Sequence, residues 1–207
     1  MLSSIPCRDK FFKETSNHYK DVLEEFKGKN GDIFTIVGPW DFSPIYDMLG
    51  SMESQISSFK SISDNIDSIS DYTVIAIGMS IFPVGKPRSP HTDNHPTDGR
   101  FKRYHLPLQL TDTSFIHVME NGTNDWKQYP WELGKWMEFS GIQHTHYPYN
   151  EDPNNIPRIV LIMDIFEGEP TDQDVWDYYI EIEKLGWISD NNFRPHYEKY
   201  VSNKNNK

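Results

Sequence analysis

The sequence RIVLIMDIF, residues 158–166, is the strongest strand signal in the chain. Its apolar side chains would fall on both faces of an extended chain, which is typical of a strand covered on both sides. Isoleucine and valine, which favour strands, make up much of it. Arg158 opens this otherwise apolar run, and a buried cation needs a partner. We therefore expect residues 158–166 to be a central strand.

Four stretches upstream also have strand character. Residues 72–82 form a continuous β-branched run, and residues 103–110 alternate between apolar and polar side chains. Residues 115–119 and 135–139 are shorter apolar segments. Short strands separated by turn signals predict a β-sandwich or barrel over residues 72–166.

Helical patterns precede this core, over residues 8–60. A first helix would end near Gly28, and a second would begin at Ser43, with Pro44 at its first helical position. Residues 57–70 are rich in Ser and Asp, and we expect a loop there.

After the core, residues 171–186 have the apolar stripe of a helix. The chain is predicted to be one domain over residues 1–201, with a polar, disordered tail over residues 202–207. The expected class is mainly β with flanking helices.

The overall charge limits the function classes. The chain has 207 residues, with 20 Lys and Arg against 31 Asp and Glu, for a net charge of −11. An acidic surface repels phosphate backbones and anionic membranes, so neither nucleic acid nor a membrane is an expected partner. One cysteine, Cys7, excludes an internal disulfide framework. Without a secretory signal or an apolar span, the expected location is cytoplasmic. No oligomeric state is indicated.

Two short histidine motifs carry candidate chemistry. They are His91-Thr92-Asp93 and His144-Thr145-His146, and residues two apart in an extended chain point the same way. Two histidines and one carboxylate form the facial triad that holds iron(II) in non-haem oxygenases, with three positions open. An arginine about a dozen residues after the last histidine, here Arg158, would bind the distal carboxylate of 2-oxoglutarate.

Each motif alone has an ordinary explanation. His91 and Asp93 lie between Pro90 and Pro96, where a solvated loop is the default. His144 and His146 would suit an exposed strand end, and Arg158 a surface ion pair of little energetic consequence. The order of the motifs along the chain favours the joint interpretation.

Four blocks at these residues resemble the aspartyl/asparaginyl β-hydroxylase family of iron(II)- and 2-oxoglutarate-dependent oxygenases. The resemblance covers about residues 75–170. The blocks are Ser80-Ile81-Phe82 with Gly85 and Ser89-Pro90-His91-Thr92; Arg103-Tyr104-His105-Leu106; Trp131-Glu132-Leu133-Gly134-Lys135 with Phe139; and Arg158 through Phe166.

The resemblance implies a double-stranded β-helix, the cupin-like jelly roll, and a hydroxylase that uses Fe(II), 2-oxoglutarate and O₂. It assigns His91 as the first iron ligand and His146 as the second, with Asn150 four residues later, as in the family. His144 stays an alternative, because the spacing from Phe139 fits neither histidine fully.

Further residues match family positions that contact 2-oxoglutarate; they are Ser80, Arg103, His105 and Arg158. For His105, a hydrogen-bonded core histidine is a close competing interpretation.

The sequence departs from the best-known members at Asp93, where those members have glycine. Asp93 would either complete the triad with His91 and His146 or turn away and leave two histidine ligands. The segment between His91 and Arg103 also looks longer than the family norm, and we expect its loop, residues 94–99, to contact substrate.

The substrate would be an amino-acid side chain, free or in a peptide or protein. Residues 85–105 form a basic island in the acidic chain, which suits anionic ligands. The chain offers no dedicated protein-docking domain, which slightly favours small substrates. The alternative function is a non-catalytic cupin-like protein that binds a metal or a ligand without turnover.

Overall fold

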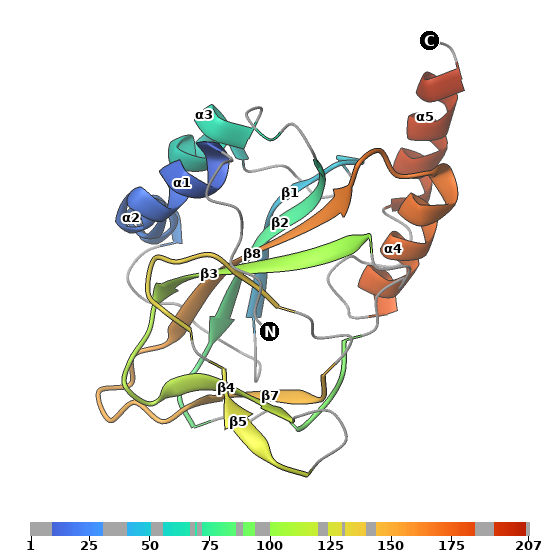
Figure 1. Ribbon diagram of the computed structural model, residues 1–207. Helices are drawn as coiled ribbons and strands as arrows, with labels where there is room; N and C mark the ends of the chain where they lie inside the picture. The colour runs from blue at the N-terminus through green and yellow to red at the C-terminus, as the bar shows by residue number, and fades with distance from the viewer. Residues whose placement is uncertain are drawn as a thin grey trace.

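The computed structural model describes residues 10–30, 41–50, 56–66, 69, 72–85, 89–93, 100–119, 124–129, 131–139, 144–184 and 193–205. The helical elements, shown in Figure 1, are α1 (Lys10–Asn17), α2 (Tyr19–Asn30), the short 3₁₀ turn η1 (Ile56–Ser58), α3 (Lys60–Ile66), α4 (Asp172–Lys184) and α5 (Phe193–Asn205). The strands are β1 (Asp41–Asp47), β2 (Tyr72–Phe82), β3 (Phe101–Gln109), β4 (Ser114–Met119), β5 (Trp126–Gln128), β6 (Met137–Glu138), β7 (His146–Asn150) and β8 (Arg158–Glu167).

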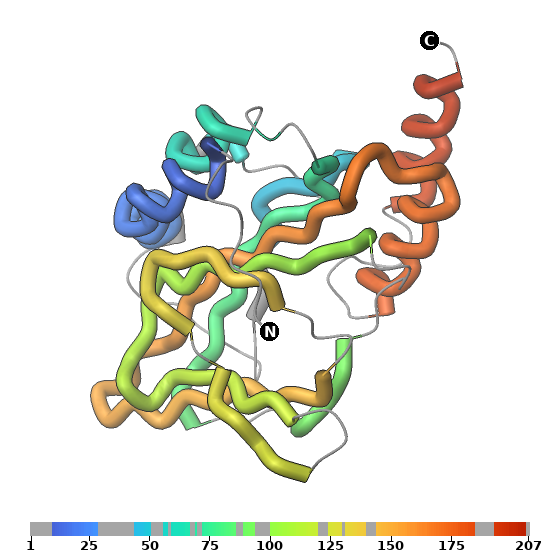
Figure 2. Tube along the Cα trace, viewed as in Figure 1, coloured from blue at the N-terminus to red at the C-terminus, as the bar shows by residue number. Residues whose placement is uncertain are grey.

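The strands form two antiparallel sheets. The large sheet has the order β1-β2-β8-β3-β6, and the small sheet has the order β5-β4-β7. Strand β8, predicted from RIVLIMDIF, lies at the centre of the large sheet between β2 and β3. The chain leaves the large sheet after β3 for β4 and β5, returns to it at β6, enters the small sheet again at β7, and ends in the large sheet at β8 (Figure 2). The predicted β core with flanking helices is confirmed.

Successive side chains of β8 point to opposite faces of the large sheet. Ile159, Leu161, Met163 and Ile165 are fully buried in a core shared with Phe11, Phe12, Val22, Phe26 and Ile62 of the first three helices. Helices α1 to α3 therefore cover one face (Figure 1). Arg158 and Asp164 lie on the alternate positions, so they belong to the opposite face.

A second core joins the C-terminal helices to one end of the sheet. Ile75 and Phe166 pack there with residues of α4, namely Val175, Tyr178, Tyr179 and Ile182. The helix predicted over residues 171–186 is thus present as α4, whereas residues 185 and 186, its predicted end, lie outside the described residues.

The prediction of a helix that begins at Ser43 is wrong. The chain there forms strand β1, which pairs with β2 at the edge of the large sheet. Pro44 has no N–H to donate, and an edge strand tolerates this because one side of its backbone needs no partner. The register shifts between Pro44 and Tyr46, as expected next to a proline.

Two other predictions also need correction. The expected loop over residues 57–70 contains helix α3, because Phe59 and Ile62 are buried in the main core. The expected disordered tail from residue 202 is helical through Asn205. Helix α5 is anchored by Phe193, which packs on Trp176 and Tyr179 of α4 at ring distances of 5.5 and 5.8 Å. Lys204 adds ion pairs with Glu169 and Asp172.

None of the helices in the described parts of the chain has the length and apolar character needed to cross a membrane.

Candidate metal and co-substrate site

The backbone brings the two predicted histidine motifs together. His91 and His146 face each other in an antiparallel bridge, with N–H···O distances of 2.9 Å from His91 and 2.8 Å from His146. Directly opposed residues of an antiparallel pair share a face, so both imidazoles point the same way. Their ring centroids lie 4.4 Å apart. This bridge adds the His91 segment to the edge of the small sheet beside β7.

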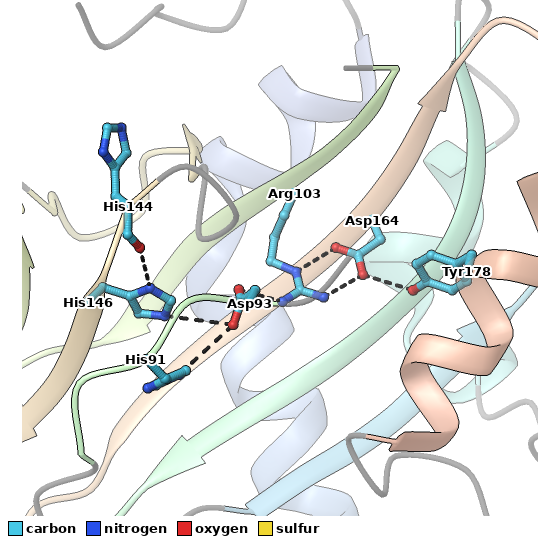
Figure 3. Close-up of polar contacts among 7 residues, drawn as sticks. All are labelled: His91, Asp93, Arg103, His144, His146, Asp164 and Tyr178. Atoms are coloured by element: carbon cyan, nitrogen blue, oxygen red, sulfur yellow. Dashed lines mark hydrogen bonds and ion pairs between the residues drawn. The ribbon is translucent and has the colours of Figure 1, made fainter. Parts of the chain in front are cut away.

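Asp93 completes a three-residue cluster. Its Oδ1 atom lies 3.9 Å from His91 Nε2 and 3.8 Å from His146 Nε2. One ligand atom from each of the three side chains falls within 4.8 Å of the others. Figure 3 shows both rings and the Asp93 carboxylate converging on one place. The structure therefore turns Asp93 inward, as the three-ligand interpretation requires.

The hydrogen bonds of the imidazoles fit a metal. His91 Nδ1 lies 2.8 Å from the Ser89 carbonyl oxygen, and His146 Nδ1 lies 3.1 Å from the His144 carbonyl oxygen. A proton on each Nδ1 leaves the lone pair of Nε2 directed at the cluster, which is the tautomer of a metal-bound histidine. Burial lowers the pKa of His146 to about 4, so its ring is neutral near pH 7.

His144, the alternative ligand, lies outside the cluster. Its carbonyl oxygen accepts the hydrogen bond from His146, while its ring points away from Asp93 in Figure 3. Asn150, at the end of β7, is buried and donates from Nδ2 to the carbonyl oxygens of Phe82 and Ile156. It therefore ties the histidine strand to the large sheet.

Arg158 is a deeply buried cation. It is 3% exposed, and neither its Nε nor its Nη1 has a hydrogen-bond partner among the described residues. The guanidinium lies between the rings of Phe82 and Trp131, 4.8 and 4.7 Å from their centroids. Burial lowers the pKa of Arg158 to about 9. Buried polar atoms left unpaired are costly, so this arrangement fits an anionic ligand.

His105 and Trp131 add further buried polar atoms that lack partners among the described residues. Both ring nitrogens of His105 and Nε1 of Trp131 are buried without a partner in the described part of the chain. Burial, reinforced by the charges of Arg103 and Arg158, lowers the pKa of His105 to about 3. A hydrogen-bonded core histidine, the competing interpretation of His105, does not match its unpaired nitrogens.

A row of ring contacts connects the histidine cluster to Arg158. His146 packs edge-on against Phe139 at 4.8 Å, and Phe139 stacks on His105 at 4.8 Å. His105 contacts Trp131 at 5.6 Å, and Trp131 covers Arg158. The cluster and Arg158 therefore line one continuous region between the two sheets. Trp131 belongs to one of the four blocks that resemble the family, but no sequence pattern predicted that its indole N–H would be buried at this site.

Ser80 and Arg103 take different places in this region. Ser80 is buried on β2 opposite Val160, on the same face of β2 as Phe82. Arg103 forms a bidentate salt bridge with Asp164, in which both hydrogen bonds are 2.7 Å long. Its Nη1 atom also donates to Asp93 Oδ2 at 3.1 Å. The structure thus directs Arg103 toward Asp93, while its predicted contact with 2-oxoglutarate stays a prediction.

The predicted basic island is largely neutralised where the structure describes it. Arg100 pairs with Asp174, and Lys102 pairs with Glu167. Lys86, Arg88 and the predicted substrate loop, residues 94–99, lie outside the described residues.

Comparisons with known proteins agree with this geometry. The family model for aspartyl/asparaginyl β-hydroxylase matches residues 10–167, more than half of the chain. No curated protein sequence matches significantly.

Several solved structures are similar to this chain at low sequence identity. A prolyl hydroxylase from Trichoplax adhaerens, in complex with a peptide fragment of the hypoxia inducible factor oxygen degradation domain, has a TM-score of 0.50 and 14% identity, over 77% of this chain and 90% of that one. A prolyl-4-hydroxylase from Pseudomonas putida has a TM-score of 0.47 and 12% identity, over 75% and 88% of the two chains. HygX from Streptomyces hygroscopicus, with nickel and 2-oxoglutarate bound, has a TM-score of 0.46 and 8% identity, over 72% and 79%.

The sequence match extends across both helices and strands, from α1 to the end of β8. The predicted jelly-roll fold is confirmed. The chain therefore belongs to the aspartyl/asparaginyl β-hydroxylase family and is an iron(II)- and 2-oxoglutarate-dependent hydroxylase.

Proposed function

We propose that His91, Asp93 and His146 hold the iron, that Arg158 binds the distal carboxylate of 2-oxoglutarate, and that the substrate is an amino-acid residue in a peptide or protein. The observation that carries this proposal is the inward-facing cluster of His91, Asp93 and His146. When bound, iron(II) with O₂ supplies the oxidation: 2-oxoglutarate loses CO₂ and becomes succinate with one oxygen atom, and the other oxygen atom converts a substrate C–H to C–OH.

The chain's own residues would bind and orient the reactants. The two imidazoles and the Asp93 carboxylate occupy three ligand positions and leave the others open for co-substrate. The Nε and Nη1 atoms of Arg158, which have no hydrogen-bond partner among the described residues, are donors that a carboxylate would accept from. Phe82 and Trp131 cover this guanidinium, so its pair with the carboxylate would form out of contact with water, where it is stronger.

The charges of the described site residues also suit this pair of ligands. The carboxylates of Asp93 and Asp164 balance the guanidinium groups of Arg103 and Arg158. Iron(II) and the 2-oxoglutarate dianion balance each other, so loading both together adds no net charge to a buried region. Loading either alone would leave an uncompensated charge, which favours their joint binding.

The ligand assignment is tested by comparing two neighbouring histidines. We expect His146→Ala to lose most of the cobalt(II) affinity of the metal-free protein, because it removes one of three ligands. His144→Ala is the matched control and should keep wild-type affinity, since the hydrogen bond to His146 comes from its backbone carbonyl, which the substitution retains. Equal losses in both variants, or loss in His144→Ala alone, would contradict the assignment.

The substrate class is proposed from the family, whose name specifies aspartyl and asparaginyl side chains. The Trichoplax prolyl hydroxylase was solved with a peptide, which shows only that this fold can accommodate one. The test is succinate release in the presence of short peptides with a central Asp or Asn, against free aspartate and asparagine. We expect stimulation by peptides and a mass gain of one oxygen atom. Stimulation by the free amino acids alone would replace this proposal with the small-substrate hypothesis.

A further inference from the structure

A buried series of hydrogen bonds leads from Asp93 to the C-terminal helix α4. Tyr178 Oη donates to Asp164 Oδ2 at 2.8 Å. Asp164 accepts from Arg103 through both oxygens, and Arg103 donates in turn to Asp93 Oδ2. Figure 3 shows these four side chains in sequence, ending beside His91 and His146. The groups come from α4, β8, β3 and the segment after the first histidine.

Each contact in this series restricts the next one. Arg103 and Asp164 are directly opposed on β3 and β8, which sets their two-pronged geometry. Tyr178 is 1% exposed, and its hydroxyl donates to the same Asp164 oxygen that accepts from Arg103 Nη2. Burial and the nearby Asp164 raise the pKa of Tyr178 well above its usual value, so the phenol stays a donor.

The two oxygens of Asp93 have separate contacts. Oδ1 lies near the Nε2 atoms of both histidines, whereas Oδ2 accepts the hydrogen bond from Arg103. A carboxylate held through one oxygen presents the other in a fixed direction. Groups that orient metal ligands in this way strongly affect metal affinity.

We propose that Tyr178 is a positioning residue for the metal centre and acts through Asp164 and Arg103 to aim Asp93 at the ion. This inference rests on the proposed role of Asp93 as a ligand. Tyr178 lies beyond residues 10–167, the part of the chain that the family model matches. The packing of helix α4 against the sheet is therefore coupled to metal affinity.

The neighbouring tyrosine provides a matched control. Tyr179 is also buried on α4, and its Oη donates to the buried carboxylate of Asp47 at 2.8 Å. Asp47 belongs to β1, which is separated from β3 by two strands of the large sheet. Tyr178→Phe and Tyr179→Phe each remove one buried hydrogen bond to a carboxylate, yet only the first removes a contact of this series.

The test is titration of the metal-free, full-length variants with cobalt(II) alone, followed by its visible absorption. We expect Tyr178→Phe to weaken cobalt affinity about fivefold, because direct partners of metal ligands affect affinity about 10- to 100-fold and Tyr178 is more remote. Tyr179→Phe should stay within about twofold of wild type. The unfolding temperature without metal should fall in both variants, since Tyr178→Phe loses the hydrogen bond to Asp164 and Tyr179→Phe loses those with Asp47 and the Leu49 N–H.

A double-mutant cycle tests whether Tyr178 affects cobalt affinity through Asp93. In an Asp93→Ala background, Tyr178→Phe should cause no further loss of cobalt affinity, because the carboxylate through which it acts is gone. Unchanged affinity in Tyr178→Phe, equal losses in both tyrosine variants, or a full effect without Asp93 would each overturn the inference. If Tyr178→Phe does not fold, Asp164→Asn replaces it, with an expected loss of at least about tenfold.

Failure of this inference is distinguishable from failure of the proposed site. His91→Ala measured in the same titration reports on the metal centre itself. Retained affinity in His91→Ala would reject the metal centre. Loss in His91→Ala together with wild-type affinity in Tyr178→Phe would reject only the role of Tyr178.

Discussion

At the scale of single residues, Arg158 shows how a binding site can oppose stability. Its guanidinium is buried and its pKa is lowered to about 9, since burial penalises the charged form. An apolar core would avoid this cost, and the aromatic faces of Phe82 and Trp131 offset only part of it. We infer that the arginine is retained for a ligand that neutralises it.

This account predicts the behaviour of Arg158→Met. Without co-substrate, the variant should unfold at the same temperature as wild type or higher, because a buried cation with two donors unpaired among the described residues is replaced by an apolar side chain. Addition of 2-oxoglutarate with cobalt(II) should raise the unfolding temperature of wild type but not of the variant. Thermal denaturation with and without 2-oxoglutarate measures both effects. Equal stabilisation by 2-oxoglutarate in both proteins would make Arg158 a structural residue.

His105 predicts a pH dependence of stability. The pKa of its ring is about 3 in the folded protein, against an ordinary value of 6.5, because burial disfavours the charged form. Between these values the unfolded chain binds the proton that the folded chain does not. Stability therefore rises with pH through this window and is lost as the pH falls below about 6.5.

The corresponding test is His105→Leu. The free energy of unfolding of the metal-free protein should fall between pH 6 and pH 4, and the variant should show a slope smaller by about 1.4 kcal/mol per pH unit. Urea denaturation at several pH values measures the two slopes. An identical slope in both proteins would show that His105 is protonated in the folded state.

The residues of the site differ in how far the sequence could predict them. His91 and Asp93 are two apart, so their shared direction follows from local geometry alone. The choice of His146 over His144 depends on the backbone bridge to His91, a contact 55 residues away along the chain. The pairing of Arg103 with Asp164 depends on the register of β3 against β8, which no local pattern specifies.

At the scale of elements, tertiary packing decides the segments where local patterns failed. The apolar spacing after Ser43 predicts a helix, but pairing with β2 makes this segment an edge strand. The last residues of the chain look polar, yet α5 is held by aromatic residues that precede them, chiefly Phe193 and Tyr197. A sequence window confined to residues 202–207 contains none of these anchors.

Helix α5 gives a direct test of this packing. Phe193→Ala should lower the free energy of unfolding by about 3 kcal/mol, because it removes a fully buried ring that contacts Trp176 and Tyr179. The exposed Lys199 is the control, and Lys199→Ala should change stability by less than about 0.5 kcal/mol. Chemical denaturation distinguishes the two. Equal stability of Phe193→Ala and wild type would mean that α5 does not dock on α4 in solution.

At the scale of the whole molecule, the site exists only because the two sheets face each other. His146 belongs to the small sheet and His91 is bridged to it, whereas Arg103, His105 and Arg158 belong to the large sheet. The rings of Phe139 and Trp131 fill the space between these groups. Helices α1 to α3 stabilise the large sheet from its other face without contributing a residue to the site.

Joint binding of iron(II) and 2-oxoglutarate is measured by adding both anaerobically to the full-length protein and recording its visible absorption. A 2-oxoglutarate molecule that chelates iron gives a weak charge-transfer band. Wild type and His144→Ala should give this band, whereas His146→Ala and Arg158→Met should not at the same concentrations. Absence of the band in wild-type protein that has bound iron would contradict the account, and would make the chain a metal-binding protein without the chemistry of a hydroxylase.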